Sequence, residues 1–211
     1  MASEKNLNAV FSDIANSIRS KKGTTNTIQP INMASEIDSI ETGSSDTNFK
    51  DLVEGTITSI DDSTITKVAS YTFGFSNTLL SVNLPNVISI GDQAFYNCTS
   101  LLNVSFQKLT TIDGYNNFSG CTKLQIVDIG GDVELITSTC FKGCTKLQKL
   151  ILRGSNVSAL YSNAFDNSPI KTSTTEGFIY VPDDLVESYK SATNWTVYAS
   201  KIKGLSELPT E

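Results

Sequence analysis

Hydrophobic positions recur along the chain with a period of 22–24 residues. Five phenylalanines mark the copies: Phe73, Phe95, Phe118, Phe141 and Phe165. In the first four copies, further apolar residues follow the phenylalanine after six, nine and eleven positions. One residue predicted to face outward separates the last two: Asn83, Ser105, Asp128 or Ile151. This alternation places every second side chain on one face, which is typical of a β-strand with one buried side.

A second apolar pair precedes each phenylalanine, so every copy contributes two apolar elements. The pairs are Ile65 and Val68, Val87 and Ile90, Leu109 and Ile112, Val133 and Ile136, and Val157 and Leu160. A unit of about 23 residues cannot bury its own apolar face, whereas stacked units bury a continuous core. We therefore predict a solenoid of about five repeats over residues 51–177, in which short parallel β-strands form a sheet.

Three cysteines occupy the same position of successive copies, three residues after the phenylalanine. They are Cys98, Cys121 and Cys144, with Ser76 in the first copy and Ser168 in the last. We interpret them as a column of buried thiols, since free cysteine behaves as a small apolar residue. A disulfide between neighbouring turns is an alternative. A metal site is disfavoured because the chain has no histidine and no CxxC pair, and we expect no metal and no cofactor.

The clearest copies of the unit read IGDQAFYNCTSLLNVSFQ (Ile90–Gln107) and ITSTCFKGCTKLQKLIL (Ile136–Leu152). They resemble the BspA-type leucine-rich repeat, whose unit runs I-G-x-x-A-F-x-x-C-x-x-L-x-x-I-x-L-P. The resemblance covers about Ile57 to Val181 and implies a leucine-rich repeat solenoid, α+β in class and built mainly from short parallel strands. Two copies depart from the unit. Asn117 replaces the alanine after one extra residue, and Asn167-Ser168-Pro169 replaces the cysteine motif, so we expect local irregularity at both places.

Residues 178–211 differ from the repeats and are predicted to form a C-terminal helical cap. Phe178–Val181 has the pattern of a short strand, and Pro182 and Asp183 suit the start of a helix. Further apolar residues follow at helical spacing: Trp195, Tyr198 and Ile202. The segment is similar to the usual ending of BspA-type arrays, and an open solenoid end needs such a cover.

Residues 1–42 predict helices, followed by a linker over residues 43–50. One apolar seam runs along the first helix: Leu7, Val10, Phe11, Ile14 and Ile18. A lone helix of about three turns is marginal in water, so the seam needs a partner, which is the second helix, another chain, or both. We expect attachment or oligomerisation through this segment, with a homotrimer favoured.

This N-terminal segment resembles the head of structural proteins from phages of Gram-positive hosts. The shared pattern is N-L-x-x-V-F-x-D-I-A-x-x-I-R-x-K-x-G, followed by Pro30. In those proteins the head precedes varied C-terminal domains of tail-associated and other virion proteins. The resemblance implies a head that anchors the chain to other virion proteins and repeats that are displayed on the particle.

Composition narrows the classes of partner. The net charge is −6 and no basic run is present, so we expect no nucleic-acid partner. The sequence contains no stretch of 18 apolar residues, so it predicts no membrane span. The N-terminus lacks the layout of a secretion signal, so we expect synthesis in the bacterial cytoplasm and location on a phage particle.

Catalytic constellations are not apparent in the sequence. Without histidine, a Ser-His-Asp or Cys-His arrangement cannot form, so we expect no enzymatic activity. The leading hypothesis is a phage virion structural protein whose repeats bind a host surface or its environment, as a tail adhesin or a capsid decoration. The alternatives are a BspA-like bacterial surface adhesin and a purely structural spacer.

The outward positions of the predicted strands form two columns that a partner could contact. Solenoids use such extended concave surfaces for binding, and small polar groups with Asp and Lys suit a glycan or a protein of a host cell surface. The candidate ligand-binding residues are Asn83, Asn103, Ser105, Asp128, Lys149 and Arg153. A plainly solvated face is the alternative. Tyr96, Tyr115 and Tyr161 are loop aromatics that could stack on a sugar or simply be exposed.

Overall fold

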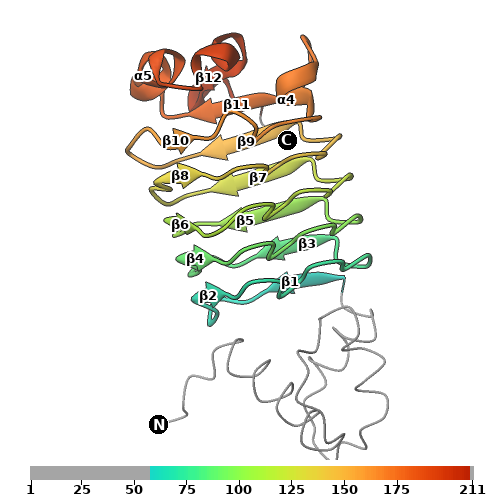
Figure 1. The fold of residues 1–211 in the computed structure, drawn as a ribbon. Coiled ribbons are helices and arrows are strands. Elements are labelled where there is room, and N and C mark those ends of the chain that lie inside the picture. Colours follow the sequence, from blue (N-terminus) through green and yellow to red (C-terminus); the bar gives the residue numbers. More distant parts are fainter. Residues whose placement is uncertain (1–57, 210–211) are drawn as a thin grey trace, which may run out of the picture.

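The computed structural model describes residues 58–209, which form an elongated stack of parallel strands (Figure 1). The predicted N-terminal helices, the linker and the apolar seam of Leu7, Val10, Phe11, Ile14 and Ile18 lie outside these residues. Within them, the chain forms the repeat-rich parallel sheet expected of a leucine-rich repeat solenoid.

One seven-stranded parallel sheet runs along the whole stack, in the order β1-β3-β5-β7-β9-β11-β12. Its strands are β1 (Ser59–Asp61), β3 (Ser81–Asn83), β5 (Asn103–Phe106), β7 (Ile126–Ile129), β9 (Lys149–Leu152), β11 (Phe178–Val181) and β12 (Ile202–Gly204). β3, β5, β7 and β9 follow the first four marker phenylalanines, β1 precedes the first of them, and β11 and β12 come from the C-terminal segment.

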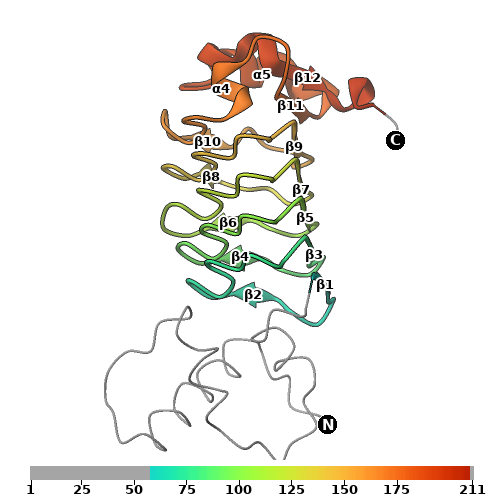
Figure 2. The same ribbon diagram turned by 90° about the vertical axis from the view of Figure 1, so that its right-hand side faces the viewer.

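The second apolar element of each copy forms a very short strand on the opposite side of the core (Figure 2). These strands are β2 (Lys67–Val68), β4 (Ser89–Ile90), β6 (Thr111–Ile112), β8 (Leu135–Ile136) and β10 (Ala159–Leu160). They form a three-stranded sheet, β2-β4-β6, and a two-stranded sheet, β8-β10. The core therefore lies between one continuous sheet and one interrupted ladder.

The register of the parallel strands places equivalent apolar residues directly beside one another. Val82 pairs with Val104, and Val104 pairs with Val127. The column continues through Leu150 to Ile179. All five are buried, and full burial of such a side chain contributes about 1.5–3 kcal/mol. A slip of one residue would expose the whole column, so the apolar pattern fixes the register.

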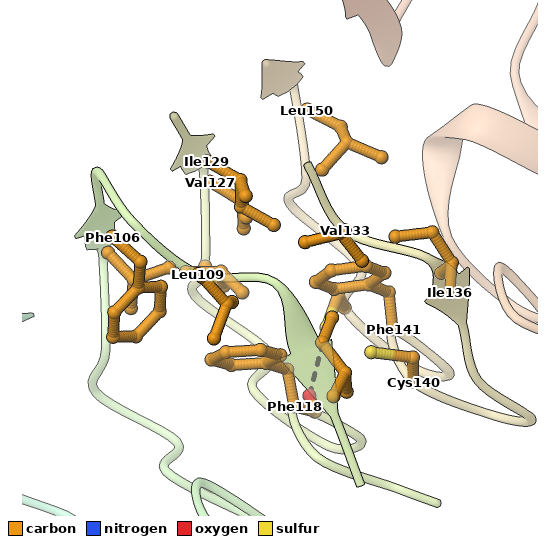
Figure 3. Packing of buried hydrophobic residues seen from close by; sticks show 14 of the residues in the cluster. Phe106, Leu109, Phe118, Val127, Ile129, Val133, Ile136, Cys140, Phe141 and Leu150 are labelled. Carbon is orange, nitrogen blue, oxygen red and sulfur yellow. Dashed lines mark hydrogen bonds between the residues drawn. The ribbon is translucent and has the colours of Figure 1, made fainter. Parts of the chain in front are cut away.

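The five marker phenylalanines stack as one continuous ladder through the interior. Their ring centroids lie 5.1, 5.1, 5.4 and 5.8 Å apart from the first pair to the last, and the interplanar angles are 20°, 5°, 7° and 7°. Figure 3 shows two members, Phe118 and Phe141, with Cys140 beside the second. Identical residues stack because each repeat presents the same backbone to the next.

The cysteines form the predicted column of buried thiols. All four are free and buried. Each thiol of the column donates a hydrogen bond to the carbonyl of the preceding copy's phenylalanine: Cys98 to Phe73 (2.9 Å), Cys121 to Phe95 (3.0 Å) and Cys144 to Phe118 (3.1 Å).

Burial raises the pKa of the Cys140 thiol to about 12 and raises that of Cys121 and Cys144 well above the ordinary value. The thiols therefore act as apolar residues with one weak donor each.

Asn117, where the sequence predicted irregularity, is fully buried and connects three consecutive copies. Its Nδ2 donates to the carbonyls of Gly91 (2.7 Å) and Asp113 (2.9 Å), and its Oδ1 accepts from Thr137 Oγ1 (3.1 Å). Because these hydrogen bonds pair both the donor and the acceptor of its amide, Asn117 can replace alanine in the core without leaving a buried polar group unpaired. The ladder of short strands is interrupted directly after this copy, between β6 and β8.

The C-terminal segment contains short helices and two strands. Its helical elements are η1 (Asp183–Leu185), α5 (Val186–Ser191), η2 (Thr196–Lys201) and η3 (Leu205–Glu207), whereas α4 (Pro169–Thr172) lies before the segment, in the last copy of the repeat. Trp195 and Tyr198 contact the last ring of the ladder, Phe165, at centroid distances of 6.2 and 5.3 Å. The helical spacing assigned to Ile202 was wrong: η2 ends at Lys201, and Ile202 pairs with Ile179 in the main sheet.

Candidate interaction surface

The outer face of the seven-stranded sheet carries two straight rows of side chains. The first row runs through Ser81, Asn103, Ile126, Lys149 and Phe178. The second runs through Asp61, Asn83, Ser105, Asp128, Ile151, Tyr180 and Lys203. We call these two rows the outer face. With strands about 4.8 Å apart, seven strands extend the face over about 29 Å.

The structure brings all six predicted ligand-binding residues onto this face. Asn83, Ser105 and Asp128 are direct neighbours in the second row. Asn103 and Lys149 flank Ile126 in the first row. All of them are exposed or half-buried, whereas their inward neighbours are buried. The period-two alternation of the sequence is thus sufficient to place them, because alternate side chains of a strand leave opposite faces of the sheet.

Arg153 joins the outer face from the residue that follows β9. Its Nε and Nη2 donate to the two carboxylate oxygens of Asp128 at 2.8 and 2.9 Å. These hydrogen bonds to the Asp128 carboxylate raise the pKa of the Arg153 guanidinium above its ordinary value. The bidentate geometry holds both side chains in place, so the middle of the face carries a fixed, neutralised ion pair.

The N-terminal half of the outer face carries small polar groups in contact along the stack. Asn83 Nδ2 donates to Asp61 Oδ1 at 2.9 Å. Gln107 Nε2 donates to Ser105 Oγ at 2.9 Å. The first contact joins successive copies, and the second lies within one copy. Both orient amide and hydroxyl groups before any partner arrives, which lowers the entropic cost of binding.

Ile151 was predicted to lie in the exposed second row, but only 4 % of its surface is exposed. Its neighbour in the row, Tyr180, is 3 % exposed. η3 packs against β11 at this end of the sheet. Burial, and then the nearby Glu207 carboxylate, raises the pKa of Tyr180. In the second row, Ile151 and Tyr180 are therefore closed to a partner, whereas Lys203 beyond them is half-buried.

Sequence reasoning missed the cationic and aromatic end of the outer face. Phe178 pairs with Lys149, and the ammonium groups of Lys201 and Lys203 lie 5.0 and 4.3 Å from the centroid of its ring. Ammonium groups over an aromatic face are attracted by its quadrupole. The signal was available, since the alternating pattern of Phe178–Val181 continues the strand register, but the segment lies beyond the last marker phenylalanine.

Nothing in residues 58–209 assembles a metal centre, because no three Cys, Asp or Glu side chains there converge suitably. The same residues include no helix with the length and apolar character needed to span a membrane. The outer face offers amides, hydroxyls, one ion pair and cationic groups, which can donate and accept hydrogen bonds over several repeats.

Comparison with known proteins assigns the repeats. Residues 66–183, more than half of the chain, match the BspA type leucine rich repeat region in six copies. The chain belongs to the BspA-type leucine-rich repeat family. The six copies compare with five predicted from the phenylalanines. No curated protein matches the chain.

Among solved structures, a leucine rich cell surface protein from Faecalibacterium prausnitzii A2-165 is similar at 20 % identity and a TM-score of 0.34. The match covers 68 % of this chain and 44 % of that protein. The chain thus corresponds to less than half the length of the similar structure. The family match begins after the segment that resembles phage proteins.

Proposed function

We propose that this protein is a non-enzymatic adhesin of the BspA type, which uses its outer face to bind an extended macromolecule on a cell surface. The observation that carries the proposal is the pair of aligned polar rows, in which Asn83, Asn103 and Ser105 lie side by side across neighbouring strands. A partner that crosses β3 and β5 would meet small polar groups on both strands.

The charge on the outer face differs between its N-terminal and C-terminal ends. Asp61 lies at its N-terminal end, the Asp128–Arg153 ion pair lies in the middle, and Lys149 and Lys203 lie toward the C-terminal end. Electrostatic complementarity favours one orientation of a partner over the other. An extended glycan or protein with acidic groups toward β11 fits this face best.

The test is adhesion of beads that carry the full chain to panels of bacterial and epithelial cells. Asn103→Glu adds an unpaired charge to the exposed middle of the outer face, and we expect it to weaken adhesion about tenfold, a loss of about 1.4 kcal/mol. Thr111→Glu is the matched control, since Thr111 is an exposed strand residue of β6, outside the main sheet.

Adhesion of the wild-type chain that Thr111→Glu preserves and Asn103→Glu reduces supports the proposal. Failure of the wild-type chain to adhere to any cell type, or equal loss in both variants, contradicts it. A chain that acts only as a structural spacer would fail to adhere to any cell type.

The expectation of a phage virion protein, with a trimeric N-terminal attachment segment, stays a prediction. It depends on residues 1–42, which lie outside the described residues and outside the family match. The adhesin proposal does not depend on that segment, because every strand of the outer face lies after residue 58.

A further inference from the structure

Exposed aromatic side chains gather at the turns of the first three copies, away from the outer face. Tyr71 is 36 % exposed, Phe75 is 44 % exposed and Tyr115 is 54 % exposed. Tyr96 completes the group, with its ring at 5.2 Å and 84° from that of Phe75. We call these four residues, with Asp92 and Gln93, the aromatic turn patch. They lie in the turns that surround the ladder phenylalanines rather than on the seven-stranded sheet.

Hydrogen bonds connect aromatic residues of this patch across successive copies. Gln93 Nε2 donates to the Tyr71 hydroxyl at 2.7 Å and to Asp92 Oδ2 at 3.0 Å. The backbone N–H of Tyr115 donates to Asp92 Oδ1 at 2.9 Å. Partial burial and the neighbouring Asp92 carboxylate raise the pKa of Tyr71, which keeps its phenol protonated. The Gln93 amide and the Asp92 carboxylate therefore connect the Tyr71 hydroxyl to the backbone of Tyr115.

The backbone of this patch is unfavourable for the side chains that it carries. Tyr71 has a φ of 63°, Phe75 of 65° and Gln93 of 53°. For bulky residues this left-handed conformation is an outlier, because Cβ approaches the following carbonyl oxygen. The position of Phe75, two residues after the ladder phenylalanine, holds smaller residues of the same conformation in the later copies: Asn97, Gly120, Gly143 and Asn167.

Stability alone would favour asparagine or glycine at position 75, as in the later copies. Instead, the first copy holds a large aromatic ring there, exposed to solvent and next to the half-buried ring of Tyr96. Strain that is retained at an exposed group with no role in the core points to a binding function. The group is also concentrated, since Tyr71 and Phe75 flank the same buried phenylalanine.

The chemistry of the patch identifies the class of ligand. The negatively polarised face of an aromatic ring attracts the C–H groups on one face of a sugar ring, and the Asp92 carboxylate and Gln93 amide bind its hydroxyl groups. The charged side chain of the patch is an aspartate, and the whole chain carries a net charge of −6. An anionic sugar would be repelled, whereas a neutral one would not.

We propose that the aromatic turn patch is a binding site for a neutral oligosaccharide, with Tyr71, Phe75 and Tyr115 as stacking surfaces and Asp92 and Gln93 as hydroxyl ligands. This site is separate from the outer face and gives the protein two surfaces of different specificity. An extended sugar chain can lie across the turns of the first three copies, which contribute one or two rings each.

The test uses the full chain on an array of neutral oligosaccharides of glucose, galactose, mannose and N-acetylglucosamine, with sulfated and sialylated oligosaccharides on the same array. We expect binding to at least one neutral oligosaccharide and a loss of about tenfold in affinity in Tyr115→Ala. Tyr161→Ala is the matched control, because Tyr161 is a turn tyrosine exposed to 51 % that lies in the last copy, outside the patch.

Binding to no neutral oligosaccharide, stronger binding to the charged ones, or equal loss in Tyr161→Ala would each overturn the proposal. Phe75→Asn provides a second readout that a structural role would not give. We expect this variant to lose affinity while its Tm stays equal to or rises above that of the wild-type chain, since asparagine tolerates the left-handed conformation. A fall in Tm with affinity unchanged would assign Phe75 to stability and contradict its role in binding.

The two proposed binding sites can be tested independently of each other. Asn103→Glu should leave oligosaccharide binding unchanged, and Tyr115→Ala should leave intact any cell adhesion that depends on the outer face. If Asn103→Glu abolishes oligosaccharide binding, the sugar binds the outer face and the aromatic turn patch is not its site.

Discussion

The middle copies of the repeat and the first copy solve the same packing problem with different residues. In the middle copies, Phe118 and Phe141 stack within 7° of parallel, a buried cysteine donates to the preceding copy, and glycine occupies the left-handed turn position. In the first copy, the Phe73 ring is tilted by 20° against its neighbour, Ser76 replaces the cysteine, and Phe75 occupies the turn position.

This difference shows that the interior tolerates little variation, whereas the turns tolerate much. A residue of the core column touches its equivalents above and below, so a change in one copy disturbs two interfaces. A turn residue touches one neighbour and solvent. The turns of the first copy can therefore carry strained, exposed aromatics at a cost that the stacked core offsets, and the turns are where copies acquire their own binding chemistry.

The largest expected effect comes from interrupting the ladder in the middle. Phe118→Ala removes a fully buried ring that stacks on Phe95 and Phe141, and we expect it to lower the free energy of unfolding by about 3–5 kcal/mol. Phe73→Ala removes a ring with one stacking neighbour in the described part of the ladder, and its loss should be smaller. Urea unfolding followed by circular dichroism measures both variants.

Equal losses in Phe118→Ala and Phe73→Ala would show that the first copy is packed as tightly as the middle ones. Tyr115→Ala is a suitable surface control, since it removes an exposed ring from the copy that contains Phe118.

The thiols give a second difference, which depends on pH. The Cys140 thiol has a pKa of about 12 in the folded chain and about 9 when exposed. Between these values the unfolded chain loses the proton and the folded chain keeps it, so stability is complete below pH 9 and falls as the pH rises toward 12. The expected loss is about 1.4 kcal/mol per pH unit for this thiol. Urea unfolding measured between pH 8 and 11 reports the slope.

Cys140→Ala isolates this contribution, because alanine occupies the equivalent position at Ala94 and Ala164. Its unfolding free energy should fall less steeply above pH 9 than that of the wild-type chain. An unchanged slope would mean that Cys140 is accessible to hydroxide in the folded protein, contrary to its burial.

The core and the turns also differ in how well the sequence predicts them. The phenylalanine ladder, the buried thiols and the outward positions of Asn83 and Asn103 follow from periodicity, because a repeated backbone places equivalent residues in one column. The burial of Ile151 does not follow, since its neighbour in the second row is Tyr180, which comes from the segment after the last marker phenylalanine. The contact of Gln93 with Tyr71 was missed because it depends on turn conformations that hydrophobic periodicity does not report.

The smallest expected effect tests the left-handed turn position itself. At Gly143 the φ is +73°, and an added Cβ would lie 3.7 Å from the nearest atom, the Gly120 nitrogen, which is an ordinary contact. Gly143→Ala should therefore cost only backbone strain, about 1 kcal/mol once the reduced freedom of the unfolded chain is subtracted. Gly143→Asn should cost less, since asparagine adopts this conformation at Asn97 and Asn167. Thermal unfolding of the two variants compares them directly. If alanine costs no more than asparagine, the left-handed position is not strained, and the exposed Phe75 of the first copy needs no binding function to explain it.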